Sequence, residues 1–185
     1  VAVRLNTEKV GSRWYPGAGI YRHVRLVKTY PLHVDQWGVF VTTPHISDME
    51  AEAKIYVKIR NHLPEQQKGH YSVAIYELDS EDRIGEKVSS CNSPVLYFPA
   101  NTWMEDSISL KVLSPKRWSL EETNRYLVQV TVYKGKKKVD QYEVPFGFRT
   151  IEFTHDNGFL LNGKRVQIQG TCNHHDLGAL GTAIN

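Results

Sequence analysis

The chain has 185 residues, of which 41% are hydrophobic and 23% charged, an ordinary globular composition that excludes a wholly disordered chain. Its formal net charge of +3 comes from 23 basic and 20 acidic residues without a broad basic stripe, so we expect no nucleic-acid partner. No apolar run approaches the roughly 18 residues that a membrane-spanning helix needs, so we expect no membrane partner either.

The first 35 residues hold a glycine- and aromatic-rich stretch at 14–22 (WYPGAGIYR), followed by an alternating segment at 23–27. These residues are too few to form a core of their own. The chain also lacks an initiator methionine. We therefore expect its beginning to be the end of a neighbouring domain.

From about residue 36 to 150, apolar and polar residues alternate with the period of two that is typical of half-buried antiparallel strands. Turn signals separate the alternating segments, and no convincing amphipathic helix interrupts them. The sequence therefore predicts an all-β fold, an immunoglobulin-like antiparallel β-sandwich. Strands are expected at 37–41, 53–60, 71–76, 108–112, 126–132 and 140–146, with a solvated hairpin tip at Gly135 and Lys136–Lys138.

The last 35 residues begin with a hairpin signal, GFLLNGK at 158–164, in which Asn162-Gly163 predicts a tight type I′ turn. A strand is expected next, at 165–169. This end is also too short for a core of its own, so we expect it to be the start of a further domain.

The cysteines and aromatic residues give weaker signals. Cys91 and Cys172 are too far apart to suggest zinc or a disulfide framework, and we expect no metal and no cofactor in this chain.

Tryptophans could form a sugar-stacking platform, but they more often fill cores or interfaces. The four are Trp14, Trp37, Trp103 and Trp118. Five histidines show no partner pattern and are expected at the surface: His33, His45, His62, His70 and His155.

Three motifs occur in order along the chain. SRWYPGAGIYRHVRL at 12–26 resembles the end of the N-terminal jelly-roll domain in glycoside hydrolase family 2, the family of the large bacterial β-galactosidases. FGFRTIEF at 146–153 and GFLLNGKRVQIQGTCNHHDLGALG at 158–181 resemble the family's junction between an immunoglobulin-like middle domain and a (β/α)8 barrel, and PKRWS at 115–119 resembles its turn before the penultimate strand. The resemblance implies three parts: the end of a jelly-roll domain at 1–35, the sandwich at 36–150 and the start of the barrel at 151–185.

The resemblance also implies a role for the residues after Gly170. In such barrels the active site gathers at the C-terminal ends of the strands, and a histidine of this motif contacts the sugar nearest the cleaved bond. Counted without a gap this is His174, whereas a one-residue gap would select His175. Asn173 and Asp176 complete the candidate substrate-binding set for a β-linked saccharide. A neutral imidazole can pair a sugar hydroxyl while a carboxylate fixes its tautomer.

Two other interpretations of residues 173–176 stay open. They could cap the strand end or the next helix. A metal site is the weaker alternative, because zinc needs three or four ligands in a set geometry and neighbouring residues on a strand point to opposite faces.

In the family, the acid/base and the nucleophile are glutamates on later barrel strands, which would lie beyond Asn185. We therefore expect no catalytic residue in this chain and no hydrolysis by the chain alone. The full-length protein is expected to be a retaining enzyme that hydrolyses terminal β-glycosidic bonds, and in it the sandwich would act as a spacer. The alternative is a stand-alone immunoglobulin-like module for carbohydrate binding or adhesion.

Apolar surface exposed by truncation would favour a homo-oligomer. Localisation is not fixed by the sequence, with a periplasmic or secreted location favoured over a cytoplasmic one.

Overall fold

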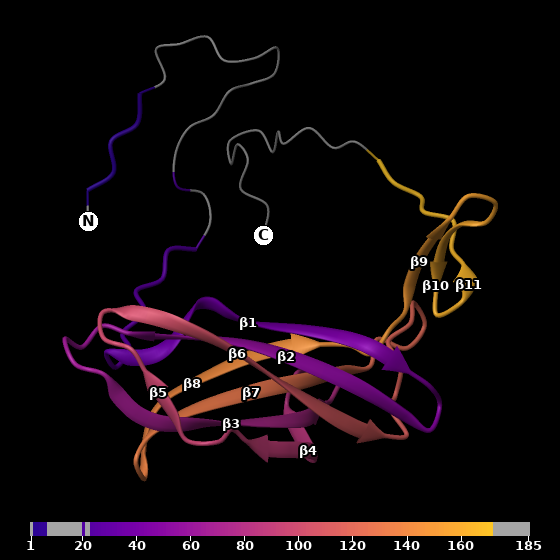
Figure 1. Ribbon diagram of the computed structural model, residues 1–185. Coiled ribbons are helices and arrows are strands. Elements are labelled where there is room, and N and C mark those ends of the chain that lie inside the picture. The colour runs from indigo at the N-terminus through magenta and orange to yellow at the C-terminus, as the bar shows by residue number, and fades with distance from the viewer. Residues whose placement is uncertain (1, 7–19, 21–22, 172–185) are drawn as a thin grey trace. The chain divides into compact units, whose positions relative to one another are not determined.

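The computed structural model describes residues 2–6, 20 and 23–171, whose regular elements are all β-strands (Figure 1). The chain divides into two compact units, one of Thr29–Gln167 and one of Val1–Lys28 with Ile168–Asn185. The described residues include no helix long and apolar enough to cross a membrane. The strands are β1 (Leu32–Ile46), β2 (Glu50–Asn61), β3 (Gln67–Leu78), β4 (Ile84–Asn92), β5 (Leu96–Phe98), β6 (Thr102–Leu113), β7 (Arg125–Lys134), β8 (Lys137–Phe146), β9 (Ile151–Thr154), β10 (Gly158–Leu161) and β11 (Lys164–Arg165).

Strands β1 to β8 form the two layers of a sandwich, which Figure 1 shows from the side. One sheet has the order β1-β2-β6, and the other has the order β4-β3-β7-β8 with β5 paired to the beginning of β3. All neighbouring strands in both sheets are antiparallel. The sequential strands are thus divided as in an immunoglobulin-type sandwich, and the predicted fold class is confirmed.

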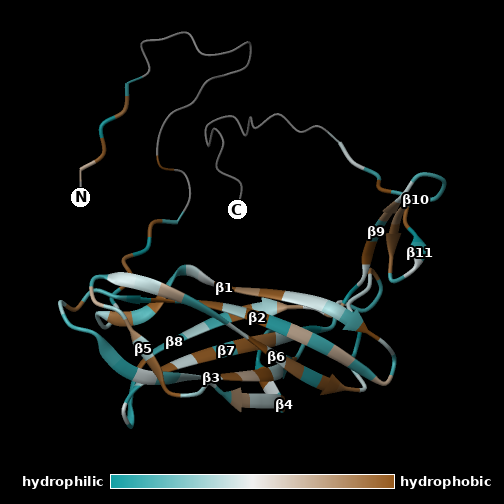
Figure 2. Cartoon of the chain, viewed as in Figure 1, coloured by the Kyte–Doolittle hydropathy of each residue, from teal (hydrophilic) through white to brown (hydrophobic). Residues whose placement is uncertain are grey.

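Alternating residues on the inner faces of the two sheets fill one core. In β2, every second residue from Ala51 to Ile59 is at most 2% exposed, and in β3 Tyr71, Val73 and Ile75 are fully buried. In Figure 2, β6 alternates between hydrophobic and hydrophilic residues, whereas β7, most of whose side chains are buried, is largely hydrophobic. Each buried aliphatic side chain contributes roughly 1.5–3 kcal/mol relative to exposure. The predicted period of two therefore identified the face that drives folding.

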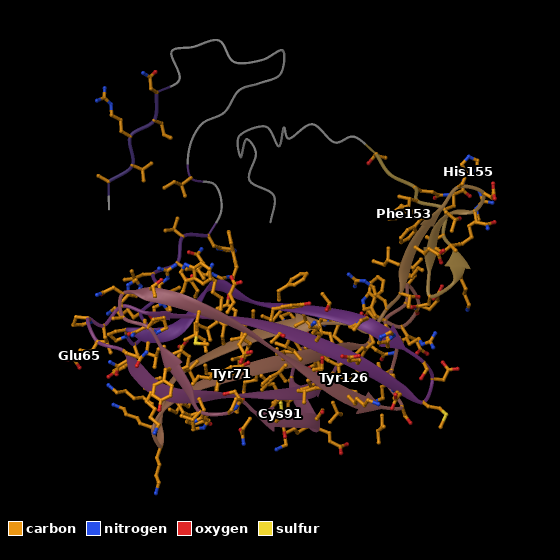
Figure 3. The ribbon with its side chains drawn as sticks, viewed as in Figure 1. Glu65, Tyr71, Cys91, Tyr126, Phe153 and His155 are labelled. Atoms are coloured by element: carbon orange, nitrogen blue, oxygen red, sulfur yellow. The ribbon has the colours of Figure 1, made fainter. Side chains whose placement is uncertain are left out.

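Two tyrosines on the second sheet connect segments that are distant in sequence. The Tyr71 hydroxyl donates a 2.8 Å hydrogen bond to Asp106 Oδ2 on β6 of the facing sheet, and the Tyr126 hydroxyl accepts one of 2.9 Å from the Lys116 amide. Figure 3 shows both side chains within the sandwich. Burial raises the pKa of both hydroxyls, so each stays protonated. The Tyr126 bond, from the start of β7 back to the preceding connection, has the form of the tyrosine corner of immunoglobulin folds.

Both glycine turns predicted from the sequence are present. Gly135, with φ of 60°, lies in the short connection between the paired residues Lys134 and Lys137. Asn162 and Gly163 have φ of 50° and 74° and connect the paired residues Leu161 and Lys164. Positive φ at both central residues is what a type I′ turn requires, which confirms that prediction.

The ends of the sandwich differ from the expected ranges. β1 begins at Leu32, ahead of the expected start near residue 36, and Leu32 is fully buried in the core. The strand expected at 165–169 is wrong in extent, because only Lys164–Arg165 forms β11 and residues 166–171 have no regular structure. A strand persists only where a neighbour supplies hydrogen bonds, and β10 alone pairs with β11 among the described residues, over two positions.

Candidate functional site

The candidate substrate contacts Asn173, His174, His175 and Asp176 lie outside the described residues, so their roles stay predictions. Gly170, which precedes them, is exposed. The described structure that leads to them is a junction between the end of β8 and the hairpin of β9, β10 and β11. All of it lies within the unit Thr29–Gln167.

The hairpin is a small antiparallel sheet with the order β11-β10-β9. Its core is sparse, since Leu161 is buried while Phe153 remains 76% exposed, with its ring centre 5.2 Å from that of Phe159. Figure 3 shows Phe153 and His155 on this hairpin. Three short strands with one buried side chain have little stability of their own, so the hairpin depends on its attachment to the sandwich.

Asn162 attaches the hairpin. Its backbone amide donates to Thr150 O and its side-chain Oδ1 accepts from the Thr150 amide, both at 3.0 Å. Its Nδ2 donates to Trp118 O at 2.9 Å, 44 residues away in sequence. The Asn-Gly signal predicted the turn but missed this second role, because both partners are distant in sequence. One asparagine therefore joins the turn of the hairpin to two segments of the junction.

The segment before the hairpin is anchored in the sandwich core by Phe148. This side chain is fully buried, and its ring meets those of Tyr126 and Phe146 edge-on, with 5.0 Å between ring centres in each pair. Its carbonyl accepts a 2.9 Å hydrogen bond from the Trp118 amide. A Cβ atom at Gly147 would lie 2.9 Å from Trp118 Cβ, so this close approach requires glycine. The motifs at 115–119, 146–153 and 158–165 thus converge in one place.

An open cleft of about 450 Å³ lies beside this junction. The Arg149 guanidinium stands over the Trp118 ring at 4.9 Å from its centre, and Arg125 is paired with Asp82 at 2.6 Å. No carboxylate or histidine is among the described residues that line the cleft, so it offers no acid–base pair. The lining residues are Val41, Thr42, Thr43, Trp118, Arg125, Pro145, Phe146, Gly147, Arg149 and Ile151.

The described residues include no group of three or more histidine, cysteine or carboxylate side chains arranged to hold a metal ion. One carboxylate pair is held by a single cation, in the exposed loop between β3 and β4. Arg83 contacts Asp79 at 2.7 Å and Glu81 at 2.8 Å. The hydrogen bond from Arg83 lowers the pKa of Asp79, which favours the ionised form. A general acid needs the opposite shift, so Asp79 does not have the raised pKa of a general acid.

The tryptophans were expected to fill the core or interfaces rather than to form a sugar-stacking platform. Trp37 is 84% exposed and Trp103 is 43% exposed, so neither fills the core, whereas Trp118 is half-buried in the junction. Trp14 lies outside the described residues. The exposure of Trp37 has a backbone cause, a bulge in β1, which alternation alone could not reveal.

Three of the five histidines have ring partners that the sequence did not indicate. His33 stacks on His62 with 5.5 Å between ring centres, and His70 stacks on Tyr133 at 4.8 Å. His33 and His70 are half-buried as a result, while the other three are exposed as expected: His45, His62 and His155. Such neighbours come from strand pairing and are invisible in a linear sequence.

Replacing Asn162 by glycine is expected to loosen the hairpin without straining its turn. Glycine accepts the positive φ, so the substitution removes only the two side-chain hydrogen bonds, which together contribute about 1–3 kcal/mol. Amide hydrogen exchange should become faster across β9 to β11 and stay unchanged in β2 and β7. Asn157→Gly is the matched control, because no described contact involves the side chain of this turn residue. Equal acceleration in both variants would contradict the attachment by Asn162.

Comparison with known proteins agrees with this architecture. The family model for Glycosyl hydrolases family 2 matches residues 32–149. The β-galactosidase BoGH2A of Bacteroides ovatus is 35% identical over the whole chain, and a putative β-glucuronidase of Formosa agariphila is 30% identical over 99% of it. The chain spans 21% and 16% of the lengths of these two relatives.

Solved structures show the same likeness. A glycosyl hydrolase family 2 member from Bacteroides cellulosilyticus is 34% identical and superposes with a TM-score of 0.81, over 92% of this chain and 23% of that one. A β-glucuronidase from Bacteroides uniformis, 27% identical, superposes with a TM-score of 0.73, over 85% of this chain and 19% of the β-glucuronidase chain. With a family model that covers most of the chain and a relative that matches all of it, this chain belongs to glycosyl hydrolases family 2.

Proposed function

We propose that this chain is the middle segment of a retaining glycosidase that hydrolyses terminal β-galactosides. Family membership supports a hydrolase of glycosidic bonds, and the relative that is 35% identical over the whole chain is a β-galactosidase. Other relatives are β-glucuronidases, so the test compares a galactoside with a glucuronide. In this proposal the flanking segments 1–35 and 151–185 belong to a jelly-roll domain and to a catalytic barrel.

The observation that carries the proposal is the attachment of the hairpin to the sandwich. Asn162 and Phe148 fix the hairpin to the sandwich within the unit Thr29–Gln167, and residues 173–176 follow later in the sequence. In this proposal the sandwich acts as a spacer between the two flanking domains.

In the proposed enzyme, His174 hydrogen-bonds a hydroxyl of the sugar next to the cleaved bond, with His175 as the alternative. Asp176 fixes the imidazole tautomer and Asn173 binds a second hydroxyl. Such bonds strengthen as positive charge develops on the sugar ring, and together they contribute several kcal/mol to transition-state stabilisation. The catalytic glutamates belong to the barrel, so the 185-residue chain alone is inactive.

The test uses p-nitrophenyl β-D-galactoside as substrate. In the full-length protein encoded by the source gene, His174→Ala should lower kcat/KM roughly 100-fold by removing a transition-state contact. His155→Ala is the control, because among the described residues this exposed hairpin side chain is paired only with Asp156. The activity of this variant should equal that of the wild type. The 185-residue chain should release no p-nitrophenol.

Three results would contradict parts of this proposal. Turnover by the 185-residue chain that His174→Ala abolishes would overturn the assignment of catalysis to the barrel. A large loss in His175→Ala with none in His174→Ala would move the sugar contact by one residue. Faster hydrolysis of p-nitrophenyl β-D-glucuronide than of the galactoside would replace the proposed substrate.

A further inference from the structure

Trp103 of β6 lies on the outer face of the β1-β2-β6 sheet, 43% exposed and with Lys58 Nζ 3.8 Å from the centre of its ring. Three further exposed aromatic side chains line a hollow on this face, and we call them the aromatic face. They are Trp37, Phe40 and Tyr56, with exposed fractions of 84%, 64% and 41%. Phe40 and Tyr56 are direct cross-strand partners, and their ring centres lie 6.2 Å apart with planes tilted by 34°. Clustered rings left in water on a sheet surface indicate a binding surface.

The backbone holds Trp37 in its exposed position. Trp37 has φ of 53°, in the left-handed region that bulky residues seldom occupy, and the register of β1 against β2 shifts between Val34 and Val39. A Cβ atom on Gly38 would lie only 2.7 Å from the carbonyl oxygen of Lys58, so the bulge requires glycine there. Bulges redirect side chains, and strained residues cluster at functional sites. The local geometry thus favours an indole that faces solvent.

Fixed polar groups surround a hollow of about 360 Å³ at the aromatic face. Lys58 Nζ lies 3.5 Å from Glu105 Oε1. Asp35 accepts two hydrogen bonds from Arg60, at 3.0 and 3.2 Å, which lower the pKa of the Asp35 carboxyl and keep it ionised. Both Lys58 and Arg60 therefore have a carboxylate partner. Hydrogen-bond donors and acceptors thus lie beside the rings.

We propose that the aromatic face binds an uncharged β-linked oligosaccharide, at a site separate from residues 173–176. A pyranose ring has an apolar C–H face that can stack on an indole and a rim of hydroxyls that can pair with Lys58 and Glu105. The hollow falls in the range of small-ligand pockets, roughly 300–1,000 Å³. Because its charges are already paired, it favours a neutral ligand.

A protein partner fits this surface less well. The centres of protein–protein interfaces are depleted of charged residues, whereas Asp35, Lys58 and Glu105 line the same hollow as the three rings. The choice of a saccharide as the ligand rests on family membership, whereas the location of the site rests on the geometry of the aromatic face. Binding at the aromatic face would hold a polymeric substrate on the enzyme, and it requires no hydrolysis by this chain.

The experiment titrates the isotope-labelled 185-residue chain with cellohexaose and, separately, with β-1,4-galactotetraose, while amide chemical shifts are recorded. At least one probe should give saturable shifts at residues 35–40 and 56–58, with a Kd of about 1 mM or tighter. Trp37→Gly, which suits the positive φ at this position, should weaken binding about tenfold by removing the stacking ring. Phe40→Ala, at an exposed position that does not affect the bulge, should weaken binding in the same direction.

Tyr97→Ala is the control, since this tyrosine is 57% exposed on β5 of the other sheet and should leave the affinity unchanged. The proposal is overturned if neither probe binds, if the shifts map to other residues, or if both variants of the aromatic face bind like the wild type. Concentration-dependent self-association that Trp37→Gly abolishes, without sugar binding, would identify the face as a protein interface instead. Because binding is measured without turnover, this result does not depend on the test of hydrolysis.

Discussion

Replacing Phe148 by alanine should lower the free energy of unfolding by about 3–5 kcal/mol. The side chain is fully buried, and its ring packs edge-on against Tyr126 and Phe146, so the shortened residue leaves a cavity that the rigid sandwich can fill only in part. The midpoint of urea unfolding should fall while the slope with denaturant stays constant. Since most small domains are stable by only 5–15 kcal/mol, this single change removes a large share of the total.

The matched control for this variant is Phe153→Ala. This variant makes the same substitution on the hairpin, where the Phe153 side chain is 76% exposed. Little apolar surface is lost from the folded state, so its unfolding midpoint should stay close to that of the wild type. Equal losses in the two variants would contradict the anchoring of the junction by Phe148.

Replacing Asn61 by alanine should cost about 2–4 kcal/mol of stability, by loss of hydrogen bonds rather than of apolar contact. Asn61 is 1% exposed at the end of β2. Its Nδ2 lies within 2.9–3.2 Å of the carbonyls of Glu65, Phe98 and Pro99, and its Oδ1 accepts from the Leu63 amide at 3.0 Å. Alanine would leave these backbone groups without their partner, and part of the site is too buried for water to replace it.

Urea unfolding also measures this effect, and Asn92→Ala serves as the control. Asn92 ends β4 in an exposed position, and its side chain makes no hydrogen bond within the described part of the chain, so the expected change is at most about 0.5 kcal/mol. Hydrogen exchange should locate the Asn61→Ala defect at the end of β2 and in β5. A loss below about 1 kcal/mol would show that Asn61 is not needed to join these segments.

The sequence by itself determined the fold class and most strands. Residues 53–60 and 71–76 alternate, and a strand places successive side chains on opposite faces, so the pattern identifies both the strand and its buried face. The Asn162-Gly163 turn was equally predictable, because few residues accept positive φ. These features depend on neighbours along the chain. Motif resemblance, rather than periodicity, indicated the family.

Only the tertiary structure decided which distant groups meet. Nothing local to Asn162 indicates that its side chain reaches Trp118, and nothing local to Phe148 indicates that it completes a cluster with Tyr126. The exposure of Trp37 likewise depends on a bulge against β2, which interrupts the alternation that sequence reasoning assumes. Alternation specifies a face but not a partner. Partners are set by strand pairing and by packing across the sandwich, which bring residues far apart in sequence into contact.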